Sequence, residues 1–223
     1  MATVSTIRLR NWGDLMYLSR IRLDTKNRQT MLALNSPNLF HGAIEASYEG
    51  ERKRTLWRID SLNGDLYVLL QSENEPDLTA FCEQFGYRGE AWETKNYDDF
   101  LSGIKCGSRW RFRITANPTK SVSKGSSDRG TVHAHITVGH QKEWLIKKGE
   151  VNGFSVDEDS FNVTGIKWLK FNKRDRKNVT LLSVAYEGIL EVIDPDLFRN
   201  AILSGIGRGK AYGMGLMTLM SCR

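Results

Sequence analysis

Three features of this sequence predict an α+β fold with antiparallel sheets. Short segments alternate apolar and polar residues with a period of two, which is typical of half-buried strands. Stretches with helical periodicity lie between these segments. In the second half the order is strand, helix, strand, strand, helix, strand, the split βαβ pattern of a ferredoxin-like (RRM-like) unit. Because 223 residues suffice for two small domains, we expect two tandem ferredoxin-like domains with antiparallel sheets.

The first unit opens with a strand over residues 16–23, where arginines alternate with aliphatic residues. Ser36 followed by Pro37 predicts the start of a helix, because serine is a good N-cap and proline is favoured at the first helical position. Two strands over residues 55–59 and 66–70 follow. This order predicts half of a small α+β sandwich.

Domain boundaries follow from where the pattern fails. Residues 73–107 lose clear periodicity and carry many acidic side chains, so we interpret them as the end of one unit and the connection to the next. Residues 1–15 are mildly basic without a pattern, which indicates an N-terminal extension or a misassigned start. The predicted domains are therefore residues 16–100 and 105–223.

The second unit begins with the clearest strand of the sequence, residues 109–116. Its even-numbered residues are apolar, whereas Arg109, Arg111 and Arg113 point to the opposite face. The other elements expected here are a polar loop at 120–130, a helix at 142–148 that turns Trp144 and Leu145 inward, strands at 161–171 and 179–193, and a helix capped by Asp194 and Pro195.

Composition indicates the class of partner and the compartment. A net charge of +6 and a pI near 9.2 favour a polyanion, although solubility alone could explain so modest an excess. Cys82, Cys106 and Cys222 are widely separated and match neither a disulfide framework nor a zinc spacing, which favours a reducing cytoplasm. No apolar run approaches the ~18 residues of a membrane span, so we expect a cytoplasmic protein without a membrane partner.

A glycine-rich segment near the C-terminus is the strongest local signal. Residues 205–215 contain five glycines, with Arg208 and Lys210 between them. Backbone N–H groups without neighbouring Cβ atoms, together with two cations, are suited to a phosphate. A simple glycine-rich turn between a helix and the last strand is the alternative.

Other cations concentrate in the second unit. The basic run at 173–177 lies between two predicted strands, so we expect it at the tip of a hairpin. Together these residues predict a surface that follows a polyanion backbone, with an affinity that falls steeply with salt. The predicted contacts are Arg109, Arg111, Arg113, Lys120, Lys124, Arg129, Lys173, Arg174, Arg176, Lys177, Gly207, Arg208, Gly209 and Lys210.

Three of the four histidines cluster at His133, His135 and His140. A metal site is one interpretation, but the spacing lacks the ligand pairs of known zinc motifs. A basic loop that meets RNA, or a polar strand edge, is favoured instead. We expect no metal and no cofactor.

The fourth histidine, His41, lies on the predicted first helix. The inward stripe there is expected to be Leu39, Phe40, Ala43, Ile44 and Ser47, which leaves His41 on the solvent side. Asp and Glu residues show no spacing typical of two-metal nucleases. If the substrate is RNA, its own 2′-OH can attack the adjacent phosphate while a histidine transfers the protons.

Several motifs occur in an order that resembles a known family. They are Met16-Tyr17-Leu18-Ser19-Arg20-Ile21, Leu56-Trp57-Arg58-Ile59, Leu70-Gln71-Ser72 before Pro76-Asp77, the run from Arg111 to Lys120 that ends in Ala-Asn-Pro-Thr-Lys, Tyr186-Glu187-Gly188-Ile189-Leu190, and the glycine-rich segment. Together they resemble the CasE family, the CRISPR repeat-processing endoribonucleases of type I-E systems. The resemblance covers about residues 16–219.

This resemblance implies two ferredoxin-like domains and a metal-independent nuclease. Such proteins bind the stem-loop of a CRISPR repeat, cut at the 3′ base of the stem, leave a 5′-hydroxyl and a cyclic phosphate, and remain bound as a subunit of the Cascade complex. The family's catalytic histidine lies on the first helix, and His41 is the only histidine there. Its basic hairpin and glycine-rich loop correspond to residues 173–177 and 205–215.

Two positions depart from the family pattern. A tyrosine often precedes the histidine by three residues, where this sequence has Asn38, and a lysine near the end of the helix is replaced by Glu45 or Ala46. Tyr48 or Lys210 is a possible substitute. A non-catalytic subunit that only holds stem-loop RNA is therefore the alternative function, and a metal nuclease built on the three clustered histidines is a third; cleavage in EDTA separates them.

Overall fold

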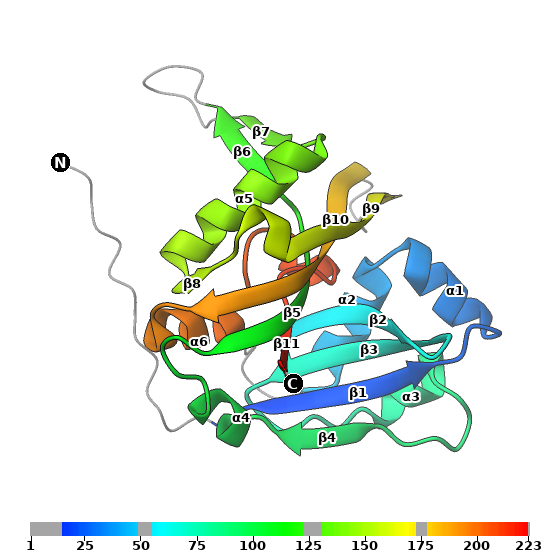
Figure 1. Ribbon diagram of the computed structural model, residues 1–223. Helices are drawn as coiled ribbons and strands as arrows, with labels where there is room; N and C mark the ends of the chain where they lie inside the picture. The colour runs from blue at the N-terminus through cyan, green and yellow to red at the C-terminus, as the bar shows by residue number, and fades with distance from the viewer. Residues whose placement is uncertain (1–14, 49–54, 123–130, 173–177, 223) are drawn as a thin grey trace.

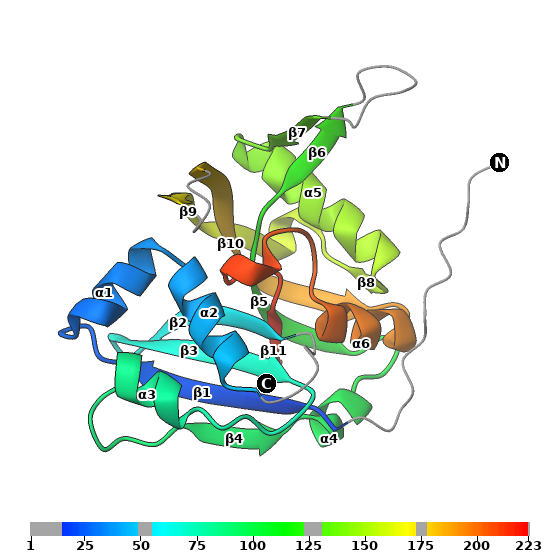
Figure 2. The same cartoon turned by 180° about the vertical axis from the view of Figure 1, so that it is seen from behind.

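The computed structural model describes residues 15–48, 55–122, 131–172 and 178–222. Two antiparallel sheets lie against each other, and helices cover the outer face of each one (Figures 1 and 2). This is the predicted α+β class with two ferredoxin-like units. No helix within the described residues combines the length and the apolar character needed to cross a bilayer.

The first sheet has the strand order β2-β3-β1-β4. Ile21, Phe40, Ile44 and Phe81 share one core, so helices α2 and α3 cover the same face of this sheet. The elements of this unit are β1 (Tyr17–Leu23), α1 (Arg28–Asn35), α2 (Asn38–Ala46), β2 (Leu56–Leu62), β3 (Asp65–Ser72), α3 (Thr79–Phe85) and β4 (Glu93–Asn96).

Residues 73–107, interpreted as the end of the first unit and the connection to the second, are more ordered than their weak pattern indicates. They contain α3 and β4, and β4 completes the sheet by pairing with β1, Tyr17 opposite Asn96. Strand β4 is Glu-Thr-Lys-Asn at a sheet edge, so it buries little and shows no apolar alternation. The first unit is therefore as complete as the second.

Helix α1 was also missed. Asn27 caps it, since its side chain accepts a hydrogen bond from the Gln29 N–H at 2.8 Å. Ser36 ends α1 instead of capping the next helix, and Pro37 is the N-cap of α2. The proline therefore marks the break between two short helices.

The second sheet has the order β11-β5-β10-β8, with β9 also paired to β10. In both sheets the first and third main strands lie in the centre, as in a ferredoxin-like unit. The elements are β5 (Arg109–Ala116), β6 (Thr119–Val122), β7 (Thr131–Ala134), α5 (Val138–Val151), β8 (Phe154–Ser155), η1 (Glu158–Ser160), β9 (Phe161–Asn172), β10 (Asn178–Val192), α6 (Pro195–Ser204), η2 (Lys210–Tyr212) and β11 (Met217–Ser221), with α4 (Asp98–Ser102) between the two units.

Most expectations for this unit are confirmed. Trp144 and Leu145 are buried, and Asp194 caps α6 by accepting the N–H groups of Asp196 and Leu197 at 3.0 Å. The polar loop expected at residues 120–130 is flanked by two short strands, and β6 pairs with β7 as a small antiparallel hairpin. The boundaries at residues 100 and 105 stay a prediction.

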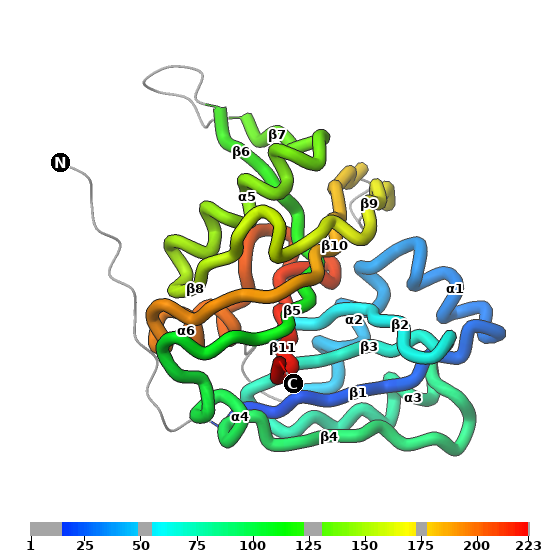
Figure 3. The backbone as a smooth tube through the Cα atoms, viewed as in Figure 1, coloured from blue at the N-terminus to red at the C-terminus, as the bar shows by residue number. Residues whose placement is uncertain are grey.

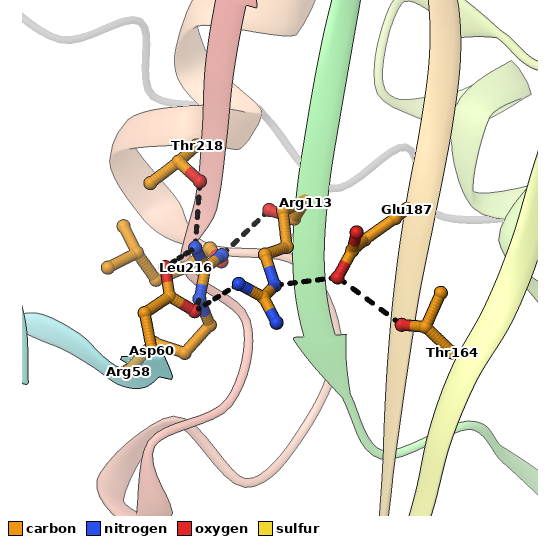
Figure 4. A network of polar contacts seen from close by, with 7 residues as sticks. All are labelled: Arg58, Asp60, Arg113, Thr164, Glu187, Leu216 and Thr218. Carbon is orange, nitrogen blue, oxygen red and sulfur yellow. Dashed lines mark hydrogen bonds and ion pairs between the residues drawn. The ribbon is translucent and has the colours of Figure 1, made fainter. Parts of the chain in front are cut away.

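A buried arginine joins the two units (Figure 4). Arg58 on β2 is 1% exposed and forms an ion pair with Asp60 at 2.6 Å. Its Nη1 donates to the carbonyl oxygens of Arg113 and Leu216 at 2.7 and 2.8 Å, and its Nη2 donates to Thr218 Oγ1 at 2.8 Å. Strand β2 of the first unit is thereby held on β5 and β11 of the second.

Candidate functional site

His41 lies on α2 at the boundary between core and solvent. Phe40 and Ile44 face the core of the first unit, whereas the His41 side chain is 30% exposed. The prediction that this ring lies outside the packed core is confirmed. Leu39 was expected to point inward but is 41% exposed, because the buried stripe of this nine-residue helix is narrower than predicted.

The two ring nitrogens of His41 have different surroundings. Nε2 lies 3.4 Å from Glu45 Oε1, one helical turn further along. Nδ1 is buried and has no hydrogen-bond partner among the described residues. The accessible side of this imidazole is therefore the Nε2 side, where Glu45 lies next to it.

The glycine-rich loop lies next to the histidine helix. Its short helix η2 packs against both α2 and β2. Figure 2 shows η2 between α2 and α5, so one loop connects the surface around His41 with the second unit. The two strongest sequence signals, which lie about 165 residues apart, are thus neighbours in space.

Glycine is required in this loop for packing as well as for backbone conformation. Gly213 has a φ of 77°, and a Cβ atom there would lie 2.8 Å from the Trp57 ring. Gly207 has a φ of 84°, and its Cβ would lie 3.0 Å from the Trp144 ring. Gly213 is therefore needed for the packing of the loop against Trp57, whereas phosphate binding by the loop stays a prediction.

The cations of the loop lie at its exposed end. Arg208 is exposed and forms a backbone bridge with Asn117, at the end of β5. The Lys210 ammonium donates to the Ser204 carbonyl at 2.6 Å, near the C-terminus of α6.

The arginine row on β5 occupies a different place. Arg111 and Arg113 face a cleft of about 960 Å³ between the sheets, opposite Arg20 and Tyr67. Helix α2 covers the other face of the first sheet, so the structure does not bring this row together with His41 (Figure 1). Because the two units pack sheet to sheet, the strand arginines lie on a different side of the first sheet from α2, and a single RNA surface that joins them to the loop stays a prediction. Arg109, at the exposed end of the strand, also points to this side.

Arg113 is also held by carboxylates. Its Nε lies 2.9 Å from Glu187 Oε1, and its Nη1 lies 3.4 Å from Asp60 Oδ1 (Figure 4). The RNA-binding role of Arg109, Arg111 and Arg113 stays a prediction.

The remaining predicted cations fall into two groups. Lys120 is exposed on β6, directly opposite His133 on β7. Strands β9 and β10 stay paired up to Asn172 and Asn178, on either side of the basic run. Six predicted contacts lie outside the described residues: Lys124, Arg129, Lys173, Arg174, Arg176 and Lys177.

The clustered histidines do not form a metal-ligand set. Among the residues that the structure describes, no three His, Cys, Asp or Glu side chains are gathered closely enough to hold an ion. His135 and His140 lie close, with ring centroids 5.8 Å apart, but His133 faces Lys120 across the hairpin.

The positions that depart from the family pattern are partly buried. Asn38 Oδ1 is buried without a hydrogen-bond partner among the described residues. Tyr48 packs against the first core, and burial raises the pKa of its hydroxyl. Two residues of this region escaped sequence reasoning, Glu45 as the neighbour of His41 and Arg58 as the joint between units. The sequence signal for Glu45 is its position four residues after His41 on the same helix. The signal for Arg58 is an arginine within an otherwise apolar strand.

The fold and the site define a tandem ferredoxin-like protein whose cationic glycine-rich loop adjoins a helix-borne histidine. The family model described as CRISPR associated protein matches residues 16–220, and the chain belongs to this family.

Individual relatives support this membership. The CRISPR-associated endoribonuclease Cse3 of Thermus thermophilus is 29% identical over 221 residues, which cover 92% of this chain and 99% of the relative. The CRISPR system Cascade subunit CasE of Escherichia coli is 28% identical over 161 residues, 69% of this chain and 73% of the relative. Among solved structures, Thermus thermophilus Cse3 bound to an RNA representing a pre-cleavage complex matches with a TM-score of 0.77 and 27% identity, covering 92% of this chain and 99% of that one.

Proposed function

We propose that the protein is an endoribonuclease that binds the stem-loop of CRISPR repeat RNA and cuts at the 3′ base of the stem. The observation that carries this proposal is the packing of the His41 helix against the cationic glycine-rich loop. This arrangement occurs in a chain that matches an RNA-bound Cse3 over 92% of its length.

The chemistry follows from the groups at this place. The RNA supplies its own nucleophile, the 2′-OH next to the scissile phosphate. His41 accepts the hydroxyl proton while the oxygen attacks phosphorus, and the 5′ oxygen leaves and takes up a proton. Arg208 and Lys210 stabilise the added negative charge of the transition state. The products are a 2′,3′-cyclic phosphate and a 5′-hydroxyl, and no metal takes part in a step.

The decisive experiment compares wild-type protein with His41→Ala on the repeat hairpin from the same genome, in EDTA. Wild type should release one discrete fragment, and His41→Ala should bind the RNA equally well but cut at least ~100-fold more slowly. His133→Gln is the matched control and should cut like wild type, because His133 lies on a distant hairpin. Equal cutting by His41→Ala, or loss of wild-type cutting in EDTA, contradicts the proposal.

A second function, RNA binding without cleavage, is favoured by one observation. Asn38 replaces the tyrosine of the family pattern, and its side-chain oxygen is buried. Wild type that shifts the hairpin in a gel but releases no fragment would support this alternative.

The product RNA should remain bound, because the relatives include a Cascade subunit and one stem-loop surface would serve both cutting and retention. The other Cascade subunits are therefore the proposed protein partners. The cytoplasm is the proposed location, where pre-crRNA would be encountered.

A further inference from the structure

A second group of titratable side chains lies on the far side of the glycine-rich loop from His41. We call it the histidine cluster: Lys120 on β6, His135 after β7, and His140 and Lys147 on α5. Lys120, His140 and Lys147 are exposed, and His135 is partly exposed. The chemistry proposed for His41 uses none of them.

Local bonds hold the two rings in place. The His135 N–H donates to the Pro118 carbonyl at 2.9 Å, and the His135 carbonyl accepts from Gln141 Nε2 at 2.9 Å. His140 Nδ1 lies 2.8 Å from Thr137 Oγ1, the N-cap of α5. These bonds fix the backbone at His135 and the ring of His140.

The local field at this place is suited to an anion. The first turn of α5, a 14-residue helix, directs its N-terminal dipole toward the rings. Burial lowers the pKa of His135, and the positive charges of His140, Lys120 and Lys147 lower it further. Glu143 is the one opposing carboxylate that acts on this ring. In the free protein, these neighbouring positive charges therefore disfavour the protonated form of His135, and a bound anion would offset their effect.

The cluster is continuous with the proposed RNA surface. Pro118, which holds His135, follows Asn117, and Asn117 forms the backbone bridge to Arg208. Gly207 packs against Trp144 of the same helix α5. Figure 2 shows the glycine-rich loop between α2 and α5, so an RNA that crosses the loop from the α2 side would reach α5 next.

We propose that the histidine cluster binds an RNA phosphate together with a proton, so that repeat RNA binds more tightly as the pH falls. This proposal rests on the proposed function, because it assigns a second contact for the same RNA. A phosphate neutralises the surrounding cations, which favours the protonated imidazole in the complex. Protonation and RNA binding then strengthen each other.

The sign of the effect follows from linkage. Because the pKa of the imidazole is higher in the complex than in the free protein, binding takes up a proton between these two values. Affinity therefore rises as the pH falls through that window and is flat above it. We expect about tenfold tighter binding at pH 6 than at pH 8 for one proton taken up.

The test uses the full chain with His41→Ala, which removes the proposed cleavage and leaves the histidine cluster unchanged. Dissociation constants for the repeat hairpin are measured between pH 6 and pH 8 at constant ionic strength, for this protein and for the same protein with His135→Gln and His140→Gln. Glutamine retains a polar side chain but cannot take up the proton. The pH dependence should be lost in the triple variant, while His41→Ala with His133→Gln should keep it.

The outcomes are distinguishable. An equal pH dependence with and without His135 and His140, or no pH dependence in His41→Ala, overturns this proposal while leaving the endoribonuclease proposal intact. Absence of hairpin binding by His41→Ala at every pH overturns both. If the triple variant does not fold, His41→Ala with His135→Gln alone decides, because the His135 side chain is partly exposed and its loss should reduce the pH dependence by itself.

Discussion

The two faces of this molecule use the same residue type for different purposes. Between the two sheets, arginines meet carboxylates: the buried Arg58 pairs with Asp60, and Arg113 pairs with Glu187. On the helical side, Arg208 lies exposed on the glycine-rich loop next to the His41 helix. The net charge of the sequence does not distinguish these arginines, although Arg58 and Arg113 are paired with carboxylates and Arg208 faces solvent. The difference teaches that a cation is informative about a ligand only once its intramolecular partners are known.

The largest loss of stability should come from removing Arg58, which joins the two units. Arg58→Met leaves Asp60 beside a buried site and removes the donors to the Arg113 and Leu216 carbonyls. We expect a loss of about 3–5 kcal/mol in unfolding free energy, measured by urea denaturation. Arg20→Met is the control, since its ion pair with Glu93 is exposed and should contribute less than about 1 kcal/mol. Equal losses from the two substitutions would contradict the comparison.

A smaller loss is expected at the buried end of the glycine-rich loop. Gly213→Ala places a Cβ 2.8 Å from the Trp57 ring at a φ of 77° and should cost about 1–3 kcal/mol in stability. Gly139→Ala is the matched control, because a Cβ there meets nothing within 4 Å. Thermal melts of both variants measure the difference. A Gly213 variant as stable as the control would show that the loop adapts freely.

RNA affinity should separate the two faces directly. Arg208→Gln should weaken binding of the repeat hairpin by about 1–3 kcal/mol and reduce the salt dependence by about one phosphate contact. Arg111→Gln, in the cleft, should have the smaller effect on both quantities. Dissociation constants at several salt concentrations measure this. An equal or larger effect of Arg111→Gln would place the RNA backbone in the cleft.

The smallest expected effect is a difference in reactivity between the cysteine thiols, which is measured first on the wild-type protein. Burial raises the pKa of Cys82 to about 11, so this thiol stays protonated at neutral pH and should resist alkylation. Cys106 and Cys222 are exposed and should react first. Mass spectrometry of iodoacetamide-treated protein counts the labels. In Arg58→Met, faster labelling of Cys82 would report that the first unit opens when the joint is lost, and unchanged labelling would confine the damage to the cleft.

Much of the fold could be predicted because its elements are local in sequence. Apolar and polar residues alternate strictly over residues 109–116, and Asp194-Pro195 marks the start of α6. Both elements were therefore predicted nearly to the residue. Strand β4 and helix α1 were not found, because a short polar edge strand and an eight-residue helix bury too little to leave a periodic signal. Of the candidate site, the exposure of His41 followed from its helical position.

The amino-acid sequence by itself determined the α+β class, the position of His41 outside the inward stripe of its helix and the need for a glycine-rich loop, because each depends on backbone preference and on the spacing of apolar residues within one element. Only the tertiary structure decided that η2 packs on α2, that the β5 arginines face the first sheet, and that Arg58 joins the units. Which arginine is neutralised and which faces solvent depends on how the two sheets pack. The contacts between the sheets join residues more than fifty positions apart along the chain, such as Arg58 and Arg113.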